Sequence, residues 1–436
     1  MSSKVDGAVV IVGRTNACAT GRAIGIQGRY LMIRSSSQFN STSSYREASS
    51  NQKVLPLFND PPTEILLFDQ GPNEEEVTRI LSQEAYHFKV ETIPGVNRYD
   101  GTRVASNDPT RDRFIHGRFP APRRRKSEWM TWGIFDGHGG WETADVLEKH
   151  ILAFFRKRFA ETIVKTATED RVRTIMRKAF IELDHSIIEG SDIVAQSDRP
   201  TQDKVKALAI SNSGSSALLS IYVPETRDLH VAWTGNSRAV LVTTEVSSKG
   251  YSLLSLSKDH TYSNLSKSEQ LFLSRAQKGL IQDGRLLGLK TTRSFGDGYL
   301  KRSKSLQEHL ANKFALKQPS SQIINPPYIT AEPDVSTHKI DPTRPSFLIM
   351  ASDGEERVPD YPRFYFDQGA ELMSDSSMKE RRTIKDDNAA VHLVRNALGG
   401  NHHEMIASVL AVNKGSSRGI RDNITVQVIF FNTPHL

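Results

Sequence analysis

Residues 132–140, which read WGIFDGHGG, form an apolar run that ends at Asp136 and continues into glycines. An aspartate at the end of a strand, followed by residues that let the backbone approach closely, offers a hard cation both its carboxylate and the next peptide carbonyl. His138 stands beside this pair and suits proton transfer near neutral pH. The segment therefore predicts a metal site and an acid in one short loop, although Asp-Gly pairs also form ordinary strand-to-helix turns.

Two distant segments repeat this pattern. Residues 347–354 (FLIMASDG) form an apolar run that ends at Asp353, and Asp422 precedes an alternating apolar stretch at 424–430. Carboxylates cluster only where a cation offsets their repulsion, so three aspartates at strand ends can converge on one divalent ion. We therefore expect Asp136, Asp353 and Asp422 to be metal ligands, with turn or cap aspartates as the alternative.

Composition limits the classes of protein that fit. Hydrophobic residues make up 37% and charged residues 25% of the 436 residues, and no apolar run approaches the roughly 18 residues needed to span a bilayer. Much of the net charge of +7 is local, in residues 1–45 and in the basic cluster 123–126, so we expect no nucleic-acid partner. Cys18 is the only cysteine, which excludes an intramolecular disulfide and a multi-cysteine zinc site.

Hydrophobic periodicity predicts alternating helices and short strands. The first helix is expected after Asn73, a capping residue followed by three glutamates. Further helices are expected at 143–159, 172–187, 267–276, 387–398 and 403–412, and strands within 85–134 and at 216–223, 229–233, 238–243, 347–351 and 424–430. The Gly235-Asn236 turn is expected to join two of these strands as a hairpin. Short, hairpin-linked strands favour antiparallel sheets faced by helices.

The remaining segments set the expected domain boundaries. Residues 1–50 are rich in Ser and Arg and poor in acids, which is typical of a mitochondrial presequence that folds as a basic amphipathic helix, with an ordinary disordered tail as the alternative. Residues 51–436 are expected to form one domain, in which 196–206 is a loop and 301–322 a polar insertion.

Several motifs in chain order resemble those of one family, the metal-dependent Ser/Thr protein phosphatases of type 2C (PPM). They are FDGHGG at 135–140, SGSSALLSIYV at 213–223, HVAWTGNSRAVL at 230–241, SKDH at 257–260, TTRSFGD at 291–297, ASDG at 351–354 and RDNITV at 421–426. The segments 84–90, 284–301 and 325–338 look more particularly like the pyruvate dehydrogenase phosphatases of mitochondria.

The resemblance implies an α+β fold, a central antiparallel β-sandwich flanked on both faces by α-helices. It also implies two Mg²⁺ or Mn²⁺ ions that activate a water to attack the phosphorus of a phosphoserine or phosphothreonine in a protein. The phosphoprotein would be the pyruvate dehydrogenase complex and the location the mitochondrial matrix. Carried over by motif, the implied site residues are Asp136 as bridging ligand, the Gly137 carbonyl, Asp353 and Asp422 on the first metal, His138 as general acid, and Asp112 behind the ligands.

Acidic or phosphate-binding positions of the family are changed in this sequence. Arg111 stands where a glutamate usually binds metal, and Asn107 stands where the family has a phosphate-binding arginine. Asn236 and Arg357 replace two carboxylates of a third, weaker metal position, which Glu355 or Glu356 would restore only in a reshaped loop. Because lost negative charge weakens dication binding, a catalytically impaired phosphoprotein-binding relative stands as the alternative to an active phosphatase.

Overall fold

The computed structural model describes residues 8–10, 29–34, 64–69, 71–121, 128–162, 168–245, 250–265, 270, 279–354, 386–400, 402–412 and 421–433. No helix in these ranges has the length and apolarity that crossing a membrane demands. Apart from residue 270, the expected helix at 267–276 lies outside the described residues, as do the positions Glu355, Glu356 and Arg357.

Two six-stranded antiparallel sheets form the centre of the protein. The first has the order β11-β10-β16-β17-β5-β4, with bounds Tyr251–Ser255, Arg238–Thr244, Ser346–Ala351, Ile424–Phe431, Val96–Val104 and Tyr86–Lys89. The second has the order β15-β9-β8-β7-β6, with bounds Asp334–Lys339, Asp228–Thr234, Gly214–Val223, Glu128–His138 and Arg113–Pro120. The short strand β14 (Phe295–Gly296) also pairs with β8 in this sheet.

The alternation of side chains along β7 shows how the sheets are packed. Ile134 and its neighbour Trp132 on the same face join a buried cluster with residues of the other sheet, such as Leu348 and Ile429. Phe135 points the opposite way and joins the cluster beneath the helices. Both faces of this strand are therefore buried, which explains why its sequence reads as a continuous apolar run rather than an alternating one.

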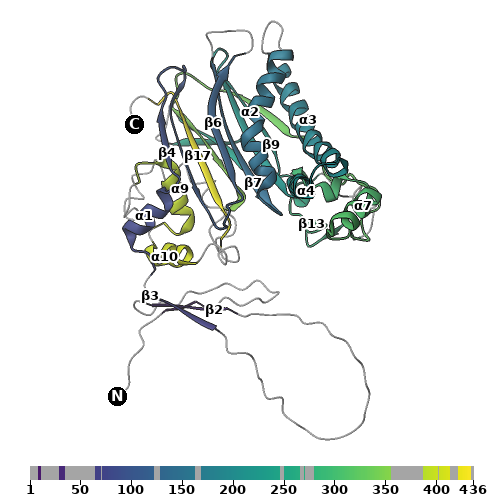
Figure 1. Ribbon diagram of the computed structural model, residues 1–436. Helices are drawn as coiled ribbons and strands as arrows, with labels where there is room; N and C mark the ends of the chain where they lie inside the picture. Colours follow the sequence, from purple (N-terminus) through teal and green to yellow (C-terminus); the bar gives the residue numbers. More distant parts are fainter. Residues whose placement is uncertain are drawn as a thin grey trace, which may run out of the picture.

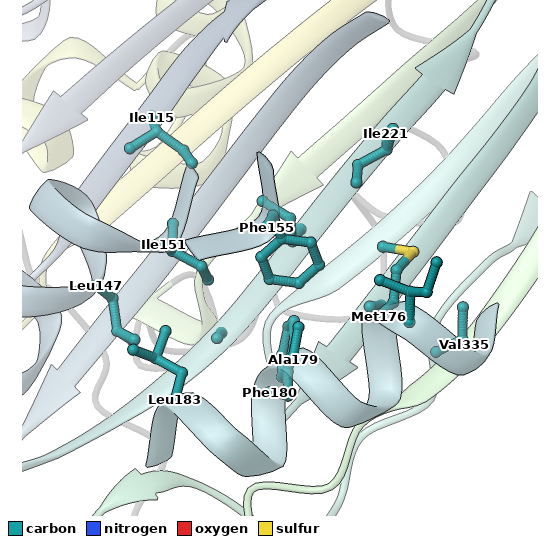
Figure 2. Close-up of a cluster of buried hydrophobic side chains, with 14 of the residues drawn as sticks. Ile115, Leu147, Ile151, Phe155, Met176, Ala179, Phe180, Leu183, Ile221 and Val335 are labelled. Atoms are coloured by element: carbon teal, nitrogen blue, oxygen red, sulfur yellow. The ribbon is translucent and has the colours of Figure 1, made fainter. Parts of the chain in front are cut away.

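Helices cover both outer faces of the paired sheets (Figure 1). On one side lie α2 (Glu142–Thr162) and α3 (Glu169–Gln196), on the other α1 (Glu74–Ser82), α9 (Ala389–Leu398) and α10 (His403–Ala411). Figure 2 shows Phe155 of α2 and Phe180 of α3 in the core beneath the first pair, in the same buried cluster as Ile221 of β8. The predicted α+β sandwich with helices on both faces is thus confirmed.

Local sequence signals account for the helix boundaries. Asn73 caps α1 as expected, because its side-chain oxygen accepts a hydrogen bond from the backbone N–H of Glu76 at 2.9 Å. Val77 and Leu81 then form the buried side of that helix. In α3 the apolar residues recur at helical spacing from Val172 to Ile187, which gives the helix its continuous buried stripe.

Two sequence expectations were wrong. Residues 196–206 are not all loop, because α4 (Thr201–Asn212) begins immediately after Pro200 and buries Leu208. The Gly235-Asn236 turn does not form a hairpin either, since β9 and β10 belong to different sheets and the chain crosses between them there. The hairpin partner of β9 is β8. Turn residues show where a chain bends, but the burial of both flanking strands decides which strand each one pairs with.

The predicted insertion at 301–322 contains a helix, α7 (Lys304–Phe314), which Ser303 caps. It borders an open pocket of about 780 Å³ beside the short hairpin of β12 (Ile281–Gln282) and β13 (Arg285–Leu286). Leu280, Leu310 and Ile323 supply part of its apolar lining.

The amino-terminal segment is described only as backbone. Strand β1 (Ala8–Val10) runs parallel to β2 (Arg29–Arg34), which pairs in turn with β3 (Glu64–Asp69). The backbone of these short stretches is extended rather than helical, and most of residues 1–50 lies outside the described ranges. The presequence stays a prediction.

Candidate active site

The site is built around the end of β7. The strand does not stop at Asp136, as the sequence had indicated, but continues in register with β8 so that Asp136 pairs with Ser216 and His138 with Gly214. A Cβ atom on Gly214 would overlap His138 Nε2 and Asp297 Oδ2, so only glycine allows these side chains to cross the strand. Gly137 is equally confined, because a Cβ there would lie 2.6 Å from the Arg111 carbonyl oxygen.

Four aspartates influence one another at this end of the sandwich. Burial raises the pKa of Asp136 well above its usual value, and the charges of Asp353, Asp112 and Asp422 raise it further. Burial also raises the pKa of Asp112 to about 7, against the hydrogen bond that its Oδ2 accepts from Thr425 Oγ1 at 2.7 Å. Asp112 Oδ1 is buried and has no hydrogen-bond partner in the part of the chain that the structure describes. Neighbouring buried aspartates can all ionise only where a positive charge offsets their mutual repulsion.

Asp353 contacts a positively charged side chain, that of Lys290. Its Oδ2 accepts hydrogen bonds from Asn236 Nδ2 at 2.5 Å and from Lys290 Nζ at 3.1 Å. Burial opposes ionisation of this carboxyl, but the Lys290 ammonium and the hydrogen bonds outweigh it and lower the pKa of Asp353. Sequence reasoning did not single out Lys290, because it lies one residue before the TTRSFGD motif and outside any recognisable ligand pattern.

The donor set suits a hard divalent cation in chemistry and in charge. Carboxylates and a peptide carbonyl are the oxygen ligands that Mg²⁺ and Mn²⁺ prefer, and a cation would offset the mutual repulsion of the aspartates. Within the described residues, however, no three Asp, Glu, His or Cys side chains are already arranged to hold a metal ion. The charges of the sequence-predicted ligands act on one another, and Asp136 and Asp353 also share a side-chain hydrogen bond.

The segment 421–423 ties the aspartates to the loop between β5 and β6 that carries Arg111. Asn423 Oδ1 accepts hydrogen bonds from the Ser106 N–H at 2.8 Å and from Thr110 Oγ1 at 3.2 Å. Arg421 is buried, and burial lowers its pKa to about 10. The polar sequence RDN thus holds together two segments far apart in the chain, and places Asp422 at their junction.

His138 is held by a residue that sequence reasoning missed. Its Nε2 lies 2.7 Å from Asp297 Oδ2, and Asp297 is 1% exposed while His138 is 23% exposed. Burial lowers the pKa of His138, but the Asp297 charge and hydrogen bond outweigh burial, so that the pKa is raised. Ser294 Oγ donates to the same Asp297 oxygen at 2.5 Å. The signal was present in TTRSFGD, which was noted as a motif but given no chemical role.

Buried ion pairs fix the segment that carries Asp297. Lys301 Nζ donates to Asp184 Oδ2 of α3 at 2.7 Å and to the Ser294 carbonyl at 2.8 Å. Asp184 Oδ1 also accepts from the Gly296 N–H at 2.9 Å. Asp297 itself has a left-handed backbone with φ of 50°, which costs energy for a residue other than glycine. Helix α3 therefore holds the conformation in which Asp297 reaches His138.

Comparison with known proteins agrees with this architecture. Residues 97–354 match the model of the family described as Protein phosphatase 2C. The chain therefore belongs to the protein phosphatase 2C family, whose members are protein serine/threonine phosphatases.

Three individual relatives are similar to this chain over most of their own length. A protein phosphatase 2C homolog of Schizosaccharomyces pombe is 31% identical over 78% of this chain and 81% of its own length. The mitochondrial pyruvate dehydrogenase (acetyl-transferring) phosphatase 1 of Saccharomyces cerevisiae is 26% identical over 90% of this chain and 80% of its own length. The corresponding phosphatase 2 of Homo sapiens is 28% identical and covers 78% of each chain.

Proposed function

We propose that this chain is a catalytically active, metal-dependent phosphatase acting on phosphoserine or phosphothreonine in a mitochondrial protein. The observation that carries the proposal is the pair His138–Asp297, with Nε2 and Oδ2 2.7 Å apart, beside the cluster of aspartates. A chain kept only to bind phosphoproteins has no need of a half-buried histidine whose protonated form a buried carboxylate stabilises.

His138 would donate a proton to the serine or threonine oxygen as it leaves phosphorus. Asp297 keeps the imidazole charged and fixes its direction, and Ser294 fixes Asp297 in turn. Asp136, Asp353, Asp422 and the Gly137 carbonyl would hold Mg²⁺ or Mn²⁺, with Asp112 behind them. A bound cation would supply an activated water and stabilise the phosphoryl oxygens.

The relatives support a substrate and a location. Because two of them are mitochondrial pyruvate dehydrogenase phosphatases, we take phosphorylated pyruvate dehydrogenase as the candidate substrate. The acid-poor sequence of residues 1–50 fits the same compartment as a presequence. We take the phosphatase domain to reach the carboxyl terminus, which the central position of β17 in the first sheet supports.

The competing function is a phosphoprotein-binding relative with impaired catalysis. The contact between Lys290 and Asp353 favours it, because an ammonium group already occupies an oxygen of a predicted metal ligand. Arg111 in the glutamate position favours it as well. The two functions differ in turnover, which a direct assay measures.

Phosphate release from a phosphothreonine peptide tests the proposal. The purified full chain should release phosphate with Mn²⁺ or Mg²⁺ and stop when EDTA is added. His138→Gln should lose most of this activity, whereas His309→Gln, a matched change of an exposed histidine on α7, should keep it. Binding of the peptide without turnover at saturating Mn²⁺ would establish the competing function instead.

Substrate and location have separate tests. Phosphorylated pyruvate dehydrogenase should be hydrolysed faster than an unrelated phosphoprotein at equal concentration, and equal rates would remove it as the candidate. A soluble reporter fused to residues 1–50 should enter mitochondria. A reporter that stays diffuse in the cytosol would overturn the presequence.

A further inference from the structure

We propose that Lys290 is a built-in competitor for the divalent cation: its ammonium group binds Asp353 in the metal-free protein and sets how much metal the enzyme needs. The inference rests on the proposed metal site and goes beyond it, because it assigns to this chain a residue that controls metal occupancy.

The first step is the position of Lys290. The residue lies between β13 and β14 in a segment that is anchored at several points along its length. Its neighbour Leu289 donates a backbone hydrogen bond to Leu286 at 2.9 Å, and Thr292 donates to the His260 carbonyl at 2.7 Å. Thr291 forms a bridge with Thr261. The backbone of Lys290 is thereby held beside the aspartates, so the side chain reaches Asp353 from a fixed base.

The second step is the contact itself. Lys290 Nζ and Asn236 Nδ2 both donate to Asp353 Oδ2, at 3.1 and 2.5 Å, so this oxygen already has two donors. Side-chain exposure is 37% for Lys290 and 19% for Asp353, so solvent screens the pair only in part. Any dication that uses this oxygen has to displace the ammonium group or accept a positive charge close by.

The third step compares the neighbouring carboxyls. Asp353 has the cation, while Asp136 is left with negative neighbours and Asp112 with a buried oxygen that lacks a partner among the described residues. The charge on Lys290 therefore compensates Asp353 directly, whereas the pKa values of Asp136 and Asp112 stay raised. Metal binding would have to exchange the ion pair for coordination of Asp353.

The consequence is a defined effect of charge removal. Lys290→Met keeps the approximate length of the side chain and removes its charge. Asp353 then becomes available to the dication, and the repulsion between the ammonium group and the dication disappears. We expect Mn²⁺ to bind this variant about tenfold tighter or more, because one ion pair is no longer exchanged on binding. Lys290→Arg retains the charge and should bind Mn²⁺ about as weakly as the wild type.

Calorimetric titration of the metal-stripped full chain with MnCl₂, without substrate, measures this directly. Lys157→Met is the matched control, since Lys157 is 71% exposed on α2, and it should bind like the wild type. Circular dichroism of each variant confirms folding, and Lys290→Gln provides a second neutral variant.

The possible outcomes separate the two claims. Tighter binding in both neutral variants, with Lys290→Arg unchanged, supports the inference. Equal or weaker binding in the folded neutral variants overturns the role of Lys290 and leaves the metal site standing. Absence of Mn²⁺ binding in every protein overturns the metal site and the inference together.

Discussion

The acid side and the metal side of the candidate site differ in how completely the chain builds them. On the acid side, His138, Asp297 and Ser294 form a continuous set of hydrogen bonds, which Lys301 and Asp184 hold from behind. On the metal side, the charges of neighbouring aspartates raise the pKa of Asp136, and Asp353 contacts Lys290. Under the proposed function, the fold already positions the proton donor, whereas binding of the phosphoryl group requires a bound cation.

The largest expected effect is on the metal side. Asp353→Asn or Asp422→Asn removes the charge of a proposed metal ligand but conserves side-chain volume, so phosphatase activity should fall by more than about 100-fold while the fold is retained. Mutation of residues that only orient metal ligands already costs about 10–100-fold. Asp203→Asn, an exposed aspartate of α4, is the control. Unchanged turnover at saturating Mn²⁺ in either variant would remove that residue from the site.

A comparable loss is expected on the acid side, with a different substrate dependence. His138→Gln should lower hydrolysis of a phosphothreonine peptide by about 100-fold, in the usual range for loss of a general acid. Hydrolysis of p-nitrophenyl phosphate should fall far less, because nitrophenolate leaves without a proton. Equal losses on both substrates would show that His138 does not protonate the leaving group.

A smaller effect tests how Asp297 acts. The Asp297 charge raises the pKa of His138, so activity that needs the protonated imidazole persists to higher pH and is lost as the pH rises through that raised pKa. In Asp297→Asn the His138 pKa should fall, and the alkaline limb of kcat for the peptide should move to lower pH. An unmoved pH profile with lower kcat would mean that Asp297 only supports packing.

The smallest effect concerns Arg111. Arg111→Glu restores a carboxylate at the family position and removes a positive charge, so we expect Mn²⁺ to bind about tenfold tighter by calorimetry. If Arg111 instead binds substrate phosphate, metal affinity should stay the same and KM for the phosphopeptide should rise. Weaker metal binding would mean that the ligand position was assigned to the wrong residue.

Prediction of helices and strands from the sequence succeeded where the signal lies within one short segment. The Asn73 cap, the stripe along α3 and the apolar run of β7 were all readable, because caps and periodicity are local. The crossing at Gly235 was not readable, since the choice of sheet depends on residues more than a hundred positions away along the chain. Asp297 and Lys290 were missed for the same reason, as their partners His138 and Asp353 are distant in sequence.

Hydrogen–deuterium exchange with and without Mn²⁺ tests most directly whether the acid side is already formed in the metal-free protein and the metal side is assembled by metal binding. We predict that Mn²⁺ slows amide exchange in peptides containing residues 352–354 and 421–423, because coordination would tie these segments together. Peptides covering 294–302 should exchange at the same slow rate in both conditions, since the hydrogen bonds from Gly296 N–H and Lys301 Nζ to Asp184 of α3 are already formed. Strong Mn²⁺-induced protection of 294–302, or none at 352–354 and 421–423, would contradict the account.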